Sequence, residues 1–182
     1  VIPSGPRNAR ALLVSAIRDP DPVIFYEPKA LYRAFREEVP EAEEMLPIGE
    51  PQLVKEGQDL TLISYGAMMR PTLDAAQQLQ DKDGITAGVI DLLTISPFSE
   101  ELLVESVKKT GRAVVVHEAP RSFGPAAEII ARLMEKTFYY LEAPIERVTG
   151  YDIVIPLFNR ERAYLPDTER ILRAARKVLS AS

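Results

Sequence analysis

The feature of this sequence that most restricts its fold is a regular alternation of short apolar runs with longer amphipathic segments, from residue 60 onward. The short runs suit strands that are buried on both faces, and the longer segments repeat apolar residues at helical spacing. This alternation predicts parallel crossover units and a three-layer α/β domain over residues 58–182. The expected strands are residues 60–65, 87–92, 113–116 and 145–148, and the expected helices lie near residues 69–80, 98–107, 124–134 and 167–179. Asp167 is the expected N-cap of the last of these helices.

A smaller α/β unit comes before this domain. Residues 1–3 are expected to end a strand, Ser4 to cap the helix that follows, and residues 23–26 to form another strand. A lone strand–helix–strand of this size cannot bury both of its faces. We therefore expect residues 1–35 to be the tail of a domain whose earlier part is not included in the chain.

Residues 36–57 have a different composition, with many Glu, Pro and Gly residues. The prolines and glycines break any long helix, and the clustered Glu residues are typical of a solvated surface. This segment is predicted to be a linker between the two units.

Composition excludes several functions. The 182 residues carry a net charge of −5, no Cys and one His, which rules out disulfides, thiolate zinc sites and a multi-histidine metal site within one chain. No basic stripe suits nucleic acid, no apolar run approaches the roughly 18 residues that span a bilayer, and no targeting segment is visible. We expect no nucleic-acid or membrane partner, and a location in the cytoplasm or the mitochondrial matrix.

No common catalytic motif is present, so the domain is expected to act as scaffold. Two features are open to a functional interpretation. His117 follows an expected strand, beside Glu118, where it would either titrate near neutral pH or be held by hydrogen bonds at a contact. Asp19 and Asp21 flank a proline after a helix, and their carboxylates with the free helix carbonyls suit a hard cation.

Short strings along the whole chain form a recognisable series. One of them, residues 91–99, has the pattern Asp-Leu-Arg-Thr-x-x-Pro-x-Asp with two differences. Leu93 stands in place of the Arg, and Ser99 stands in place of the final acid. The other strings are residues 2–4, 15–33, 46–49, 57–62, 110–112, 117–120, 141–144, 147–152 and 164–166.

This series resembles the beta subunits of thiamine-diphosphate-dependent 2-oxo acid dehydrogenases, of the branched-chain 2-oxo acid and pyruvate dehydrogenase family. The resemblance implies a transketolase C-terminal-like domain preceded by the tail of a pyrimidine-binding domain. It also implies oxidative decarboxylation of a 2-oxo acid, with acyl transfer to lipoamide. In this family the thiamine diphosphate and magnesium lie between the alpha subunit and the upstream part of the beta subunit. We therefore expect no catalytic residue in this chain, and no activity from it alone.

The resemblance also implies a structural potassium ion in the turn that matches Ala16, Asp19 and Asp21, with Ala16 supplying a backbone carbonyl. The implied partners are the alpha subunit, a second beta subunit in a heterotetramer, and the peripheral-subunit-binding domain of a lipoyl acyltransferase. Glu142, Glu146 and Ser182 are the positions that match the acyltransferase docking residues, where carboxylates would meet a basic surface.

The substrate and two other functions stay open. Residues 117–120 and 150–152 favour a branched-chain 2-oxo acid, and pyruvate and acetoin enzymes share most of the scaffold. A transketolase or deoxyxylulose-phosphate synthase tail would belong to a single-chain enzyme without an alpha subunit. A non-catalytic binding or assembly module would fit the absence of a complete catalytic set.

Overall fold

The computed structural model describes residues 1–181 and confirms an α/β fold around one five-stranded sheet. The strands lie in the order β1–β3–β2–β4–β5, and β2 to β5 pair in parallel. β1 pairs antiparallel with β3, so the sheet is mixed rather than wholly parallel as the crossover pattern predicts. The strands are β1 (Gln52–Lys55), β2 (Leu60–Ser64), β3 (Ala87–Asp91), β4 (Ala113–Val116) and β5 (Glu146–Val148).

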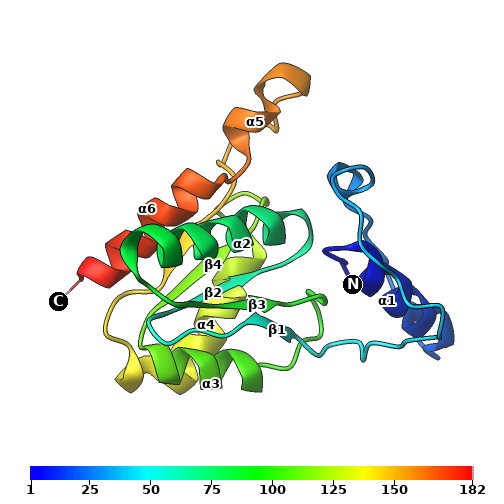
Figure 1. Ribbon diagram of the computed structural model, residues 1–182, viewed down its shortest axis with the longest axis horizontal. Helices are drawn as coiled ribbons and strands as arrows, with labels where there is room; N and C mark the ends of the chain where they lie inside the picture. Colours follow the sequence, from blue (N-terminus) through cyan, green and yellow to red (C-terminus); the bar gives the residue numbers. More distant parts are fainter. Residues whose placement is uncertain (182) are drawn as a thin grey trace.

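Helices cover both faces of this sheet and form three layers (Figure 1). Helices α2 (Met69–Gln78) and α6 (Thr168–Ser180) lie on one face, and α3 (Glu101–Thr110) and α4 (Pro125–Thr137) lie on the other. Neighbouring residues of a strand point to opposite faces. Leu62 of β2 therefore belongs to the core under α2 and α6, whereas Ile63 belongs to the core under α3 and α4.

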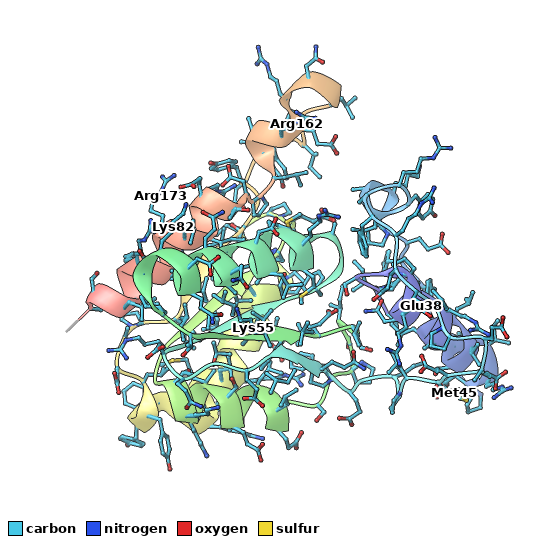
Figure 2. The ribbon with its side chains drawn as sticks, viewed as in Figure 1. Glu38, Met45, Lys55, Lys82, Arg162 and Arg173 are labelled. Carbon is cyan, nitrogen blue, oxygen red and sulfur yellow. The ribbon has the colours of Figure 1, made fainter. Side chains whose placement is uncertain are left out.

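The predicted cap of the last helix is confirmed, because the side chain of Asp167 accepts a hydrogen bond from the Arg170 backbone N–H at 2.8 Å. Among the described residues, no helix has the length and apolar content that crossing a membrane requires. Short elements complete the fold: η1 (Lys29–Leu31), η2 (Gly66–Met68), the π-helical η3 (Leu79–Asp83), η4 (Phe138–Tyr140), η5 (Phe158–Arg160) and α5 (Glu161–Tyr164). The η5–α5 segment projects from the sheet, and Figure 2 shows Arg162 on it.

The N-terminal unit consists of residues 1–48, with α1 (Pro6–Arg18) and extended chain, and lies beside the carboxyl ends of the parallel strands (Figure 1). Residues 1–3 and 23–26 are extended, but neither forms the predicted strand. Their pairing is limited to bonds from Val1 N to the Ile24 carbonyl (2.8 Å) and from Tyr26 N to the Val1 carbonyl (2.9 Å). Two such bonds do not make a ladder.

The start of α1 also differs from the prediction, because Gly5 rather than Ser4 is the N-cap. The Asn8 side chain accepts hydrogen bonds from the backbone N–H groups of Gly5 (3.0 Å) and Ser4 (3.1 Å). Asn8 thus performs the capping role from within the first turn. The Ser4 hydroxyl oxygen accepts from the Asn8 amide at 2.9 Å, and its proton is donated outside the helix.

Candidate functional site

The carboxyl ends of the parallel strands are the candidate site of this molecule. Open α/β sheets bind ligands in the crevice outside these ends. Here β2 is followed by Tyr65, β3 ends at Asp91, and β4 is followed by His117. All three side chains are buried, and the N-terminal unit lies against the same edge, since Ile2 N donates to the Leu93 carbonyl at 2.8 Å.

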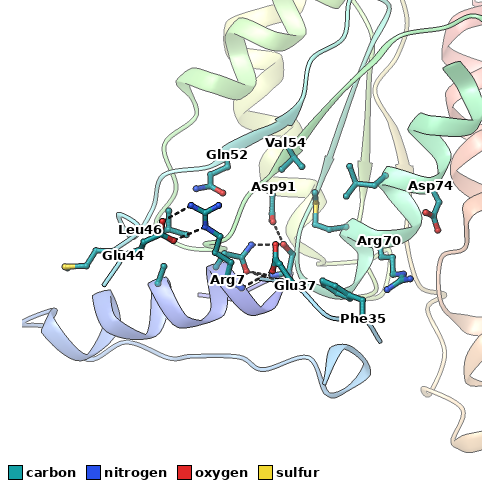
Figure 3. Close-up of a pocket in the computed structure, with 17 residues that line it drawn as sticks. Arg7, Phe35, Glu37, Glu44, Leu46, Gln52, Val54, Arg70, Asp74 and Asp91 are labelled. Carbon is teal, nitrogen blue, oxygen red and sulfur yellow. Dashed lines mark hydrogen bonds and ion pairs between the residues drawn. The ribbon is translucent and has the colours of Figure 1, made fainter. Parts of the chain in front are cut away.

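A buried hydrogen-bond network joins Asp91 to the N-terminal unit (Figure 3). The Ser4 hydroxyl donates to Asp91 Oδ2 and accepts from Asn8 Nδ2 at 2.9 Å, while Leu93 N donates to Asp91 Oδ1 at 3.2 Å. Asp91 is 1% exposed, and this burial raises the pKa of its carboxyl to about 6. The network therefore places a titratable group at the junction of the two units.

His117 does not titrate near neutral pH, as one of the two sequence interpretations expected. Its side chain is fully buried, and neither ring nitrogen has a hydrogen-bond partner within the described residues. Its ring stacks on Tyr65 with centroids 6.3 Å apart. Burial lowers the pKa of His117 to about 4, because a charged imidazole loses its hydration there. His117 is thus neutral at pH 7 and packs against Tyr65.

A cavity of about 1020 Å³ lies between the strand ends and the N-terminal unit, and we call it the edge cavity. Tyr65, Glu118 and Tyr164 are among its lining residues. Burial and the nearby charge of Glu161 raise the pKa of Glu118, and burial and Glu118 raise that of Tyr65. The other residues that line the edge cavity are Val1, Ile2, Asp19, Asp21, Pro22, Val23, Ile24, Tyr26, Ile48, Ile95, Ser96, Pro97, Ala119, Pro120, Pro125, Ile155, Glu161 and Leu165.

A second cavity, of about 890 Å³, lies between α1, the segment before β1, and α2 (Figure 3). Arg7 closes one side through a bidentate contact with Glu44, at 2.7 and 2.8 Å, and its backbone N–H donates to Glu37. Glu43 forms a 2.7 Å ion pair with Arg18. The Glu cluster is therefore not only a solvated face, because it holds the chain before β1 against α1.

The cation site predicted at Ala16, Asp19 and Asp21 lies in the turn that follows α1. Residue 20 is a proline without an N–H, so the Ala16 carbonyl lacks the helical partner that would otherwise occupy it. Asp21 N donates to Asp19 Oδ1 at 2.9 Å, and both Asp residues line the edge cavity. The turn offers two carboxylates and a carbonyl, and across residues 1–181 no group of three or more acidic, His or Cys side chains is placed to hold a metal.

Glu142 and Glu146, two of the matched docking residues, lie at the amino ends of β4 and β5, whereas the N-terminal unit lies at the carboxyl ends. Glu142 forms a 2.5 Å ion pair with Arg112, and Glu146 forms a 2.5 Å ion pair with Lys177. The third position, Ser182, lies outside the described residues. The two glutamates therefore already have intrachain partners, with the Glu142 side chain 59% exposed.

Sequence reasoning missed three residues that the fold brings to this edge: Asp91, Tyr65 and Tyr164. Tyr65 and Asp91 lie at or near the ends of predicted strands, whereas Tyr164 lies in α5, for which no element was predicted. Their burial was not readable from the sequence, because it depends on how residues 1–48 pack against the sheet.

Comparisons with known proteins give a consistent result. Residues 49–171 match the model of the family described as "Transketolase, C-terminal domain". Over 98% of its length the chain is 49% identical to "2-oxoisovalerate dehydrogenase subunit beta, mitochondrial" of Dictyostelium discoideum, covering 48% of that protein. It is 48% identical, over 98% of its length, to "Pyruvate dehydrogenase E1 component subunit beta" of Bacillus subtilis, covering 55% of that protein. The chain thus spans about half the length of the curated relatives that it matches.

One solved structure is similar over 99% of the chain and 56% of its own length. It is described as "Split gene transketolase, inactive beta4 tetramer", with a TM-score of 0.78 and 26% sequence identity. The matched part includes both the N-terminal unit and the five-stranded domain.

Proposed function

Because the chain belongs to the transketolase C-terminal domain family, we propose that it is the C-terminal part of the beta subunit of a 2-oxo acid dehydrogenase. The observation that carries this proposal is 46–49% identity, over nearly the whole chain, to beta subunits of 2-oxoisovalerate and pyruvate dehydrogenases. The activity proposed for the whole protein is oxidative decarboxylation of a 2-oxo acid, with acyl transfer to lipoamide.

Thiamine diphosphate, when bound, supplies the electron sink for decarboxylation. The described residues do not fit a site for it, because none of them forms an acidic or histidine cluster that would hold magnesium beside the diphosphate. We propose that the cofactor and magnesium lie between the alpha subunit and a part of the beta subunit outside this chain. The role of residues 1–181 is then to support that part and to form subunit contacts.

The substrate is proposed to be a branched-chain 2-oxo acid. The two strings that favour it, residues 117–120 and 150–152, lie together at the carboxyl edge, where Gly150 N donates to the Ala119 carbonyl at 3.0 Å. The relatives do not separate the substrates, since 2-oxoisovalerate and pyruvate enzymes are similar to this chain at 49% and 48% identity. The choice therefore requires a direct measurement.

We expect the intact protein, purified with its alpha subunit, to oxidise 3-methyl-2-oxobutanoate with a kcat/KM about ten-fold or more above that for pyruvate. Such a ratio is typical of a pocket that recognises extra methyl groups. The assay is acceptor-coupled oxidation with thiamine diphosphate and magnesium. The 182-residue chain alone should show no turnover. The reverse ratio would assign the protein to pyruvate, and an intact protein without an alpha partner or any turnover would favour the non-catalytic module.

The proposed assembly partners are the alpha subunit, a second beta subunit and the acyltransferase binding domain. A beta–beta contact has support from the solved neighbour, which is described as a beta4 tetramer. For the acyltransferase, Glu142 and Glu146 are the proposed docking acids together with Ser182. A basic partner would compete with Arg112 and Lys177 for these two glutamates.

We also propose that potassium binds the turn of Ala16, Asp19 and Asp21, completed by oxygens from outside the described residues. Asp19→Ala is expected to lower the stability of the intact protein by about 1–3 kcal/mol more in potassium chloride than in tetramethylammonium chloride. The comparison between salts removes the ion-independent loss of the Asp21 N–H bond. Thermal unfolding in each salt checks this, with Glu105→Ala as an exposed acid control. Equal losses in both salts would contradict the potassium site.

A further inference from the structure

A group of apolar side chains is exposed at the carboxyl edge of the sheet, and we call it the carboxyl-edge patch. Phe123 lies in the loop between β4 and α4 and is fully exposed. The other members follow β5 and are between 54% and 93% exposed: Ile153, Val154, Ile155 and Leu157. Single exposed apolar residues are normal, but a contiguous group of them indicates a contact site for another folded segment.

Hydrogen bonds between neighbouring residues join the two parts of this patch. Asp152 accepts from the Ser122 backbone N–H and from the Ser122 hydroxyl, both at 2.8 Å. Arg121 and Arg147 each donate a guanidinium N–H to the carbonyl oxygen of the other, at 3.4 and 3.3 Å. The loop that carries Phe123 is therefore fixed to the segment that carries the rest of the patch, and the two form one surface.

Phe123 is held in an unfavourable backbone conformation. Its φ is +57°, in the left-handed region that residues other than glycine rarely adopt. The exposed ring gains no contact with the described part of the chain that would offset this strain. Strained residues persist where the surrounding structure fixes them, and they are frequent at functional contacts. Here the Ser122–Asp152 hydrogen bonds fix the loop, so the ring points outward in a defined position.

The position of Val1 indicates what covers the patch. Val1 is 8% exposed and lines the edge cavity, together with Pro120 and Pro125, which flank the loop of Phe123, and with Ile155 of the patch. Because this chain spans about half the length of its relatives, the part proposed to precede Val1 is about as long as the chain itself. A folded unit of that length has a radius of gyration of about 15 Å. Such a unit, joined at Val1, reaches well beyond the edge cavity.

We propose that the carboxyl-edge patch is the docking surface for the upstream part of the same beta subunit, with Phe123 as its anchor. This proposal rests on the proposed function, because it requires the chain to be the C-terminal part of a longer subunit. A covalently joined unit has a high effective concentration at the patch, so it covers the patch in preference to a separate subunit. An aromatic ring in a fixed position suits an anchor, because it buries a large apolar area with little loss of conformational entropy.

The test is hydrogen–deuterium exchange, followed by mass spectrometry, of the intact protein purified with its alpha subunit, as wild type and as Phe123→Asn. Asparagine removes the ring but adopts positive φ more readily than most residues, so the loop keeps its conformation. We expect at least one segment of the upstream part to exchange about ten-fold faster in this variant, because it loses a buried contact. Amides of β2, β3 and β4 should keep their wild-type rates, which would show that the C-terminal domain stays folded.

Tyr139→Asn is the matched control, because Tyr139 is an aromatic residue of η4 that is 94% exposed and lies outside the patch. It should leave exchange in the upstream part unchanged. Faster exchange of Phe123→Asn only in the alpha subunit, or only in residues 1–182 of the beta subunits, would assign the patch to another subunit and overturn the proposal. Unchanged exchange in every segment would overturn it as well.

Activity of the same preparations separates this proposal from the proposed function. A complex that oxidises a 2-oxo acid, and in which Phe123→Asn exchanges like the wild type, would refute the docking surface alone. A complex without turnover, in which the upstream part still exchanges faster in Phe123→Asn, would refute the proposed function and support the docking surface.

Discussion

Gly57→Ala is expected to lower the free energy of unfolding by about 3 kcal/mol or more, because a methyl group there has no space. An added Cβ would lie 1.9 Å from the Gly88 nitrogen and 2.2 Å from the Ala87 carbonyl carbon. Both atoms belong to the backbone of β3, which is paired with β1 on one side and with β2 on the other. The clash is therefore relieved only by moving a central strand.

The start of β3 is also held from the Gly57 side, which limits relaxation further. Gln58 and Asp59 each donate a backbone N–H to the Thr86 carbonyl, at 3.1 and 3.0 Å. The Asp59 side chain accepts from the Thr86 N–H at 2.7 Å. If residues 57–59 moved away from β3 to make room for the methyl group, all three hydrogen bonds would break. The substitution is therefore expected to lower stability whether the clash remains or is relieved.

Gly88→Ala is the matched control, on the opposite side of the same contact. The nearest atoms to an added Cβ there are at 3.6–3.7 Å, an ordinary van der Waals distance. Its effect should lie within about 1 kcal/mol of the wild type. Urea unfolding of the intact protein measures both variants. A Gly57→Ala loss no larger than that of Gly88→Ala would show that β3 relaxes more freely than its pairing suggests.

The predictable part of the fold rests on local patterns. Apolar runs identify β2, β3 and β4, because strands buried on both faces need no polar alternation. Asp167 was predicted as a cap because its bond to Arg170 N spans three residues and is independent of tertiary structure. Periodicity likewise indicated α2, α3, α4 and α6 to within a few residues of their ends.

The parts that the sequence did not predict depend on distant partners. β1 lies in a segment rich in Pro, Gly and Glu, and it is a strand because β3 offers a free edge. Ser4 looked like a cap, yet its hydroxyl reaches Asp91, which is far along the sequence. The edge cavity combines residues from both ends of the chain, so no local pattern describes it.

Protonation of Asp91 is expected to make the stability of the protein fall as pH rises from about 4 to about 6. Burial raises the pKa of this carboxyl from 3.8 to about 6, so between these values the folded state binds a proton that the unfolded state has released. Stability falls with rising pH wherever the folded state holds more protons. A pKa shift of this size lowers the free energy of unfolding by about 3 kcal/mol, and the loss is complete once the pH exceeds the pKa of the folded state.

Asp91→Asn isolates this contribution, because the amide does not titrate. Its oxygen can still accept from Leu93 N, and its NH₂ group can donate to the Ser4 hydroxyl oxygen. The stability of the variant relative to wild type should therefore rise by about 3 kcal/mol between pH 4 and pH 7, measured by urea unfolding at each pH. Other acids titrate alike in both proteins and cancel.

Ser4→Ala tests the same balance from the other side. The Ser4 hydrogen bond favours the ionised carboxylate and so lowers the pKa of Asp91 against the larger effect of burial. Removing it should raise the folded pKa above about 6 and extend the fall in stability to higher pH. If the free energy of unfolding changed with pH in the same way for wild type, Asp91→Asn and Ser4→Ala, Asp91 would be hydrated in solution. The N-terminal unit would then not exclude water from this edge of the sheet.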